Sequence, residues 1–112
     1  MTNPQKRKGD AAEREAALVL CTISGHQCRR QLGAGRQDDV GDIHGIPDTV
    51  VQVAAWKDIA RAVRIKPVEV DQQKLNAAAR YAFTMVKIRG GWRIVMTPEQ
   101  FEPYLRDASY GV

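Results

Sequence analysis

The sequence predicts an α/β (α+β) fold in which a mixed β-sheet is flanked by helices. Segments with apolar residues at helical spacing alternate with short β-rich runs, and this alternation is typical of sheets covered by helices. Two pairs of these runs are separated by turn residues, Gly-Ile-Pro-Asp in the first pair and Gly-Gly in the second, which predicts two hairpins. With 112 residues, 44% of them hydrophobic, the chain is long enough for one domain over residues 1–112.

The first half of the chain is predicted to contain one helix and three strands. Ala12 and Leu20 belong to an apolar series at helical spacing, and Gly25 is a suitable residue to stop that helix. The turn of the first hairpin contains Pro47 and Asp48, which we interpret as turn residues only. The predicted elements are a helix over residues 10–24, a strand over 28–32, a Gly-rich and Asp-rich loop over 33–39, and hairpin strands over 40–44 and 49–55.

The second half is predicted to contain a helix, a hairpin and a last helix. Pro67 stands near the expected start of the first of these helices, which is rich in Ala and Gln. Thr97, followed by Pro, Glu and Gln100, has the pattern of a helix N-cap. The predicted elements are a link over residues 56–64, a helix over 68–82, strands over 83–89 and 92–96, and a helix from Thr97. The full order is αβββαββα.

The charge distribution is typical of a protein that binds a polyanion. There are 17 Lys and Arg against 13 Asp and Glu, and residues 57–93 contain nine basic residues but three acidic ones. Three smaller clusters are the basic Lys6, Arg7 and Lys8, the basic Arg29, Arg30 and Arg36, and the acidic Asp38, Asp39 and Asp42. Basic surface around clustered carboxylates suits a metal-dependent nuclease, in which cations hold phosphates and carboxylates hold the metal. A merely solubilising surface is the alternative.

Several classes of protein are disfavoured by the sequence. It has no apolar stretch near the ~20 residues that span a bilayer, and residues 1–10 lack the apolar core of a signal peptide. Cys21 and Cys28 are too few for a disulfide framework and have no zinc-ligand spacing. We therefore expect a cytoplasmic protein without a membrane partner, with residues 1–8 as a flexible basic N-terminus.

The candidate metal-binding residues lie at or near the first predicted hairpin. If Asp42 pairs across the strands with Gln52, both side chains emerge on one face, and Ala54 shares that face because side chains alternate along a strand. Glu13 on the first helix could reach the same place once that helix packs on the sheet. Two carboxylates and an amide oxygen can supply part of the oxygen shell of Mg²⁺.

These residues carry a family resemblance. The string KGDAAERE, followed by RRQLGAG, GDIHG and VVQV, resembles the phage and archaeal-type Holliday junction resolvases of the PD-(D/E)XK nuclease superfamily, over roughly residues 6–100. The resemblance implies a restriction-endonuclease-like core with the order αβββαβ, which agrees with the elements above. It also implies a homodimer, because a four-way junction has near two-fold symmetry and needs two coordinated cuts.

The resemblance assigns roles to individual residues. Glu13 corresponds to the acid on the helix and Asp42 to the central metal-binding acid. Gln52 stands where the second acid of (D/E)XK belongs and Ala54 where its lysine belongs, so the chain departs from the pattern at both. The implied metal ligands are Glu13, Asp42, Gln52 and the Val53 carbonyl. A lysine from elsewhere would replace the motif lysine, with Lys57 the first choice and Lys74 the second.

The resulting expectation is a Mg²⁺-dependent endodeoxyribonuclease that resolves Holliday junctions or other branched DNA in recombination or phage DNA processing, with Mn²⁺ able to replace Mg²⁺. The expected DNA-binding residues are Lys6, Arg7, Lys8, Arg29, Arg30, Arg36 and Lys74. One alternative is a DNA-binding protein that keeps the nuclease fold with weak or lost cleavage, because Gln52 and Ala54 replace the acid and the lysine. Another is a small nuclease for different branched or linear DNA.

Overall fold

The computed structural model describes residues 4–30 and 41–110. Within this part of the chain the predicted order αβββαββα is confirmed, with three helices and five strands. The helices are α1 (Pro4–Ser24), α2 (Ile59–Ala77) and α3 (Pro98–Tyr110). The strands are β1 (Arg29–Arg30), β2 (Ile43–His44), β3 (Thr49–Ala54), β4 (Tyr81–Ile88) and β5 (Gly91–Val95).

The five strands form one mixed sheet in the order β1-β2-β3-β4-β5. Three of the four neighbouring pairs are antiparallel, whereas β3 and β4 are parallel and are connected through α2. A parallel pair needs such a crossover because a tight turn cannot return the chain in the same direction. Both predicted hairpins are therefore present, and the β3-α2-β4 unit lies between them.

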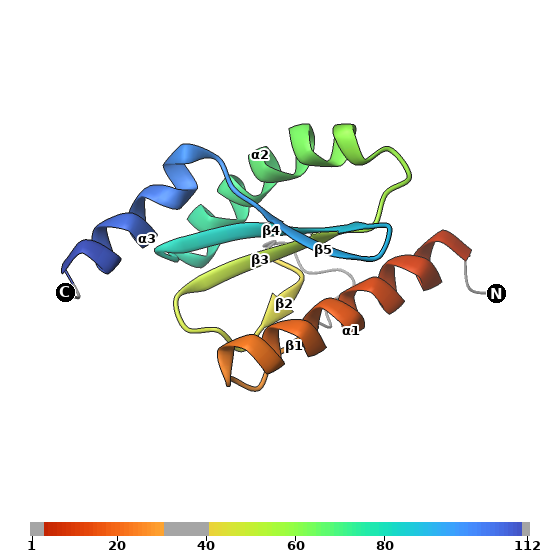
Figure 1. The fold of residues 1–112 in the computed structure, drawn as a ribbon, viewed down its shortest axis with the longest axis horizontal. Helices are drawn as coiled ribbons and strands as arrows, with labels where there is room; N and C mark the ends of the chain where they lie inside the picture. The colour runs from red at the N-terminus through yellow and green to blue at the C-terminus, as the bar shows by residue number, and fades with distance from the viewer. Residues whose placement is uncertain (1–3, 31–40, 111–112) are drawn as a thin grey trace.

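Helices cover both faces of the sheet, with α1 on one side and α2 on the other (Figure 1). The larger core lies under α1, where Ala16 and Leu20 pack against Val51, Val53 and inward-facing residues of β4. On the opposite face α2 packs through Ala62 and Val70. Successive residues of β3 alternate between these two cores, since side chains alternate along a strand.

The direction of α2 relative to β3 follows from its two buried contacts. Ala62, in the first turn of the helix, packs with Ala54 at the end of β3. Val70, two turns later, packs with Val50 near the beginning of β3. The helix therefore runs back along the strand, and residues 66 and 69 lie opposite the middle of β3.

The prediction that α2 starts at residue 68 is wrong, because the helix begins at Ile59. Asp58 is its N-cap and accepts a 3.0 Å hydrogen bond from the backbone N–H of Arg61. Pro67 lies inside the helix and is buried. A proline there removes one helical hydrogen bond, so its presence had suggested a helix start. The C-terminal boundary also differs, since the helix ends at Ala77 and β4 begins at Tyr81.

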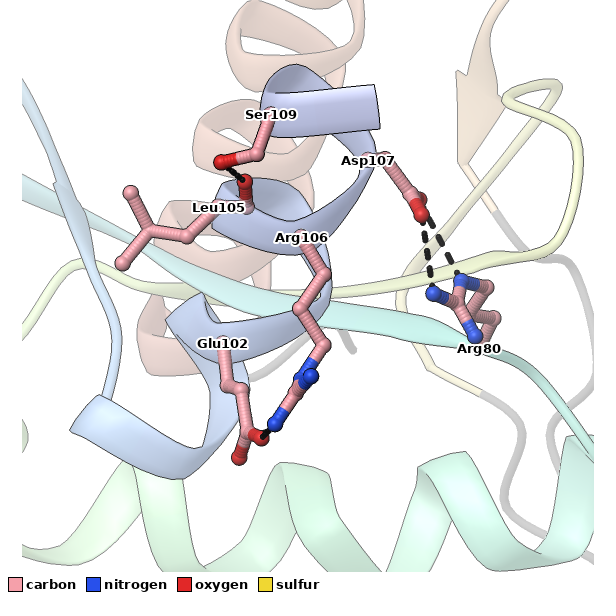
Figure 2. A network of polar contacts seen from close by, with 6 residues as sticks. All are labelled: Arg80, Glu102, Leu105, Arg106, Asp107 and Ser109. Atoms are coloured by element: carbon pink, nitrogen blue, oxygen red, sulfur yellow. Dashed lines mark hydrogen bonds and ion pairs between the residues drawn. The ribbon is translucent and has the colours of Figure 1, made fainter. Parts of the chain in front are cut away.

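The last helix is held by contacts at its start and in its last turn. Thr97 and Gln100 form the predicted capping box, with reciprocal bonds of 3.0 and 3.1 Å. The buried Gln100 amide also donates to the Pro67 carbonyl of α2. Farther along, the Arg80 guanidinium at the beginning of β4 makes a two-bond ion pair with Asp107 (Figure 2). These contacts join α3 to both α2 and the sheet.

Other boundaries differ by a few residues. Helix α1 begins at Pro4 rather than at residue 10, so residues 4–8 of the expected flexible N-terminus are helical. Strand β2 is restricted to two residues, and β3 ends one residue earlier than expected. The expected loop over residues 33–39 lies outside the described residues. Among the helices in the described ranges, none is long and apolar enough to cross a bilayer.

Candidate active site

The candidate site begins at the glycine that precedes Asp42. Gly41 has φ +102°, and a Cβ on it would lie 2.9 Å from Val50 Cγ1 and 3.0 Å from the Val51 carbonyl oxygen. Only glycine combines this backbone conformation with such a close approach. Gly41 therefore lets the chain enter β2 directly against β3, which brings Asp42 to the edge of that strand.

Asp42 is fixed to β3 by its backbone and by its side chain. Its N–H donates to the Val51 carbonyl over 2.8 Å, and its Oδ2 accepts a 2.8 Å bond from the Val53 N–H. Ile43 pairs with Val51, whereas Asp42 precedes β2, so its expected pairing with Gln52 stays a prediction. Because the N–H and C=O of one strand residue point to the same side, the Val53 carbonyl also faces this edge.

Glu13 approaches the same edge from α1. Burial raises the pKa of the Glu13 carboxyl above its usual 4.5, and the neighbouring negative charge of Asp42 raises it further. The Arg30 guanidinium opposes both effects, since its Nε lies 3.3 Å from Glu13 Oε2. Asp42 thus makes the ionised form of Glu13 less favourable, and a cation bound near both carboxylates would relieve this effect.

Arg30 forms ion pairs within the protein, so its positive charge is already compensated. Besides Glu13, its Nη2 lies 2.6 Å from Asp10 Oδ1, and all three side chains are about a quarter exposed. The sequence had predicted Arg30 as a DNA contact and had not singled out Asp10. The spacing of Asp10 and Glu13, three residues apart on one helix, was the available signal.

Gln52 faces α2, away from the α1 side of the sheet. The residue is 4% exposed, and its Nε2 donates to Glu69 Oε2 over 3.1 Å. Its Oε1 is buried and has no hydrogen-bond partner among the described residues. The buried Gln52 side chain thus donates a hydrogen bond through its NH₂ group, while its carbonyl oxygen accepts none from the described residues.

Glu69, which contacts this amide, and Lys66, which pairs with Glu69, are two residues of α2 that the sequence analysis does not single out. Lys66 Nζ lies 3.0 Å from Glu69 Oε2 and 5.0 Å from the centre of the Trp56 ring. Lys66 and Glu69 are three residues apart, a spacing that predicts an ion pair on one helix face, but only if the helix includes residue 66. The helix was expected to begin at residue 68, so the pair was not recognised.

The other predicted site residues are dispersed. Ala54 is 1% exposed and packs with Ala62 and Val86, so the position at which the resemblance would place a lysine is closed by α2. Lys57 is exposed after β3 and makes no ion pair with any described residue. Lys74 lies in the last turn of α2, beyond the Val70–Val50 contact and therefore away from Ala54.

Only some of the basic residues predicted to contact DNA belong to the part of the chain that the structure describes. Arg29 is exposed on β1, the edge strand of the sheet. Arg36 lies outside the described residues, as do Asp38 and Asp39 of the acidic cluster. The backbone of Lys6, Arg7 and Lys8 belongs to α1, but their side chains lie outside the description.

Comparison of the chain with models of protein families, with curated proteins and with solved structures found no match. The resemblance to the resolvases therefore stays a prediction.

The oxygen atoms at the edge of β3 are compatible with a hard cation, although the set is small. No group of three or more His, Cys, Asp or Glu residues able to hold a metal occurs within residues 4–30 and 41–110. Asp42 and the Val53 carbonyl lie at this edge, whereas Glu13 approaches from the α1 face and Gln52 belongs to the α2 face. All four supply oxygen atoms, which Mg²⁺ prefers, and Mg²⁺ commonly retains several waters. The unpartnered Gln52 oxygen is the observation that most favours a ligand here.

Proposed function

We propose that the protein is a Mg²⁺-dependent, structure-specific endodeoxyribonuclease that cuts Holliday junctions or other branched DNA in recombination or phage DNA processing. The observation that carries this proposal is the attachment of Asp42 to the edge of β3, beside a Glu13 carboxyl with a raised pKa. An acid so held, whose negative charge raises the pKa of a second acid, favours a bound cation. The element order αβββαββα supports a restriction-endonuclease-like core.

The residues would divide the work of phosphodiester hydrolysis. Glu13, Asp42, Gln52 Oε1 and the Val53 carbonyl would hold the metal. When bound, Mg²⁺ or Mn²⁺ supplies Lewis acidity at the phosphate and lowers the pKa of water. In the reaction the oxygen of one water forms a bond to phosphorus and one P–O ester bond breaks. The water loses a proton to solvent and the leaving oxygen gains one.

Lys57 is the proposed source of the ammonium group that neutralises charge on the phosphate. Lys66 is already engaged by Glu69 and by the Trp56 ring, and Lys74 lies toward the far end of α2. Lys57 makes no such contact, and its long flexible stem can fold toward the end of β3. We choose Lys57 because its ammonium group has no ion-pair partner among the described residues and because it follows the end of β3.

The DNA partner and the assembly are further parts of the proposal. The excess of Lys and Arg would contact phosphates, with Arg29, Arg36, Lys74 and residues 6–8 as candidates. A homodimer with two-fold symmetry would present two sites to the two strands of a junction. Such an enzyme would act in the cytoplasm, or in the host cytoplasm if phage-encoded.

A second candidate is a DNA-binding protein that retains the fold but cleaves weakly or not at all. The specific observation in its favour is Ala54, since α2 occupies the position where a lysine would be needed. Loss of both the second acid and the lysine would lower metal affinity and transition-state stabilisation together.

One experiment separates the two candidates. A labelled four-way junction is incubated with the purified protein in Mg²⁺ and, as a control, in EDTA. Symmetrically placed nicks that require Mg²⁺ support the endonuclease. A retarded but intact junction in both conditions supports the binding protein. A junction that is neither retarded nor cleaved would contradict both candidates.

A further inference from the structure

The Gln52–Glu69 contact connects the candidate site to α2. Gln52 Nε2 donates to Glu69 Oε2, and the same carboxylate oxygen lies 3.0 Å from Lys66 Nζ. Gln52 is almost fully buried, whereas the Glu69 side chain is about half exposed. A charged group at the surface thus contacts one end of a buried neutral amide.

This contact decides which way the amide points. An ionised carboxylate can only accept hydrogen bonds, so the NH₂ end of Gln52 must face Glu69. The carbonyl end is then directed away from Glu69. That end is the buried Oε1, which has no partner among the described residues. Buried polar atoms are rarely left in this state, and a bound ion or water is one explanation.

The contact also changes the chemistry of the amide oxygen. A carboxylate that accepts from one end of a conjugated amide favours electron density at the other end. The same arrangement raises the basicity of metal-binding histidines that donate to a carboxylate. Hydrogen bonds in a buried, low-dielectric setting polarise one another more strongly than in water.

We propose that Glu69 is a positioning residue that orients and polarises Gln52, so that Gln52 Oε1 serves as a divalent-cation ligand. Lys66 holds Glu69 in place through their ion pair. In this way α2 supplies, through the amide, part of the negative charge that β3 lacks at position 52. The inference deepens the proposed function and rests on it, because the cation is that of the proposed nuclease site.

The test measures Mn²⁺ binding without DNA, by counting free Mn²⁺ from its electron paramagnetic resonance signal. Glu69→Gln keeps the size of the side chain but removes its charge, and we expect Mn²⁺ affinity to fall about 10–100-fold, the usual effect of losing such a partner. Glu99→Gln removes the same charge from the exposed start of α3 and should leave the affinity unchanged.

A charge swap excludes a purely structural role. In the double variant Gln52→Glu with Glu69→Gln, the hydrogen bond can re-form with donor and acceptor exchanged, and position 52 now carries a full charge. We expect this variant to bind Mn²⁺ at least as tightly as the wild type. Circular dichroism and thermal unfolding confirm that each variant is folded before its affinity is compared.

The outcomes separate this inference from the proposed function. Equal Mn²⁺ affinity in wild type and Glu69→Gln overturns the inference, as does a wild-type protein that binds no Mn²⁺. A double variant that stays as weak as Glu69→Gln also overturns it. If Mn²⁺ binding depends on Glu69 while the junction is never cut, the inference stands and the nuclease proposal fails.

Discussion

The carboxylate of Asp42 accepts a 2.8 Å hydrogen bond from the backbone N–H of Val53, which joins the entry to β2 with the edge of β3. One carboxylate oxygen is thereby fixed to the main chain of the strand that would supply the other ligands. An acid positioned by the backbone does not depend on a flexible side-chain partner for its orientation. The Asp42 carboxylate is therefore held in place before any cation binds.

Asp42→Asn is the first test of this arrangement. The amide oxygen can still accept from Val53, but the charge that holds the cation is lost. We expect junction cleavage to fall at least ~100-fold, the scale of losing one charge-stabilising group. Junction affinity should change by less than about tenfold, or ~1.4 kcal/mol. Single-turnover cleavage and gel retardation measure the two effects. Asp58→Asn, at the start of α2, is the control, and near-wild-type cleavage by Asp42→Asn would rule out the metal-site assignment.

The source of the ammonium group can be tested with two lysines. Lys57→Ala should lower the cleavage rate at least ~100-fold while junction affinity stays within about tenfold. Lys74→Ala, in the last turn of α2, should leave the rate nearly unchanged because that residue is remote from Ala54. The reverse result, normal cleavage by Lys57→Ala and loss in Lys74→Ala, would place the cation on the helix.

Two glycines should respond to alanine in opposite directions. At Gly41 a Cβ would collide with β3 and the positive φ would be strained, so Gly41→Ala should lower the free energy of unfolding by ~1–3 kcal/mol. Gly9 lies within α1 with open space around a Cβ, so Gly9→Ala should raise it by ~0.5–1 kcal/mol. Urea unfolding measures both. Equal effects at the two positions would contradict the close approach of Gly41 to β3.

Acid should remove one stabilising contact between α1 and the second hairpin. Hydrogen bonds from Lys87 and Trp92 lower the pKa of Glu15 below its usual 4.5, so the folded protein binds fewer protons here than the unfolded chain. The stabilisation is therefore present above pH 4.5 and is lost as the pH falls through the folded pKa. Glu15→Gln should lower the melting temperature slightly at pH 7, and its difference from wild type should disappear in acid. A difference that is independent of pH would argue against an ionised Glu15.

Much of the fold could be predicted because its signals are local. The capping box of Thr97 and Gln100, and the turn containing Pro47 and Asp48, depend on neighbours within three residues. Asp48 nevertheless does more than turn the chain, since its Oδ1 accepts from the Arg80 N–H at the start of β4. That bond spans 32 residues of sequence, and no local pattern predicts it.

The missed boundary of α2 has a different cause. Pro67 is unfavourable inside a helix by local preference, but tertiary contacts compensate on both sides of it. Ala62 and Val70 pack against the sheet, and the Pro67 carbonyl accepts from the buried Gln100 amide of α3. Because these partners belong to other elements, the sequence alone favoured a later start.

The candidate site was predictable in part for the same reason. The proximity of Asp42 to Glu13 followed from motif order and from packing of the first helix on the sheet. The role of Glu69 beside Gln52 did not, because it depends on how α2 returns along β3. Side chains that meet only through a crossover connection leave no periodic signal in the sequence.

The ties of Glu15 to Lys87 and Trp92 bear on how the chain folds while it is being made. The two bonds join residues 72 and 77 positions apart. At about 5–20 residues per second, a ribosome adds those 72 residues in roughly 4–14 s. Helix α1 therefore leaves the ribosome several seconds before the hairpin that anchors it exists. Until β3 and then β4 have been made, Ala16 and Leu20 on the apolar side of α1 lack the strand residues against which they pack in the folded protein.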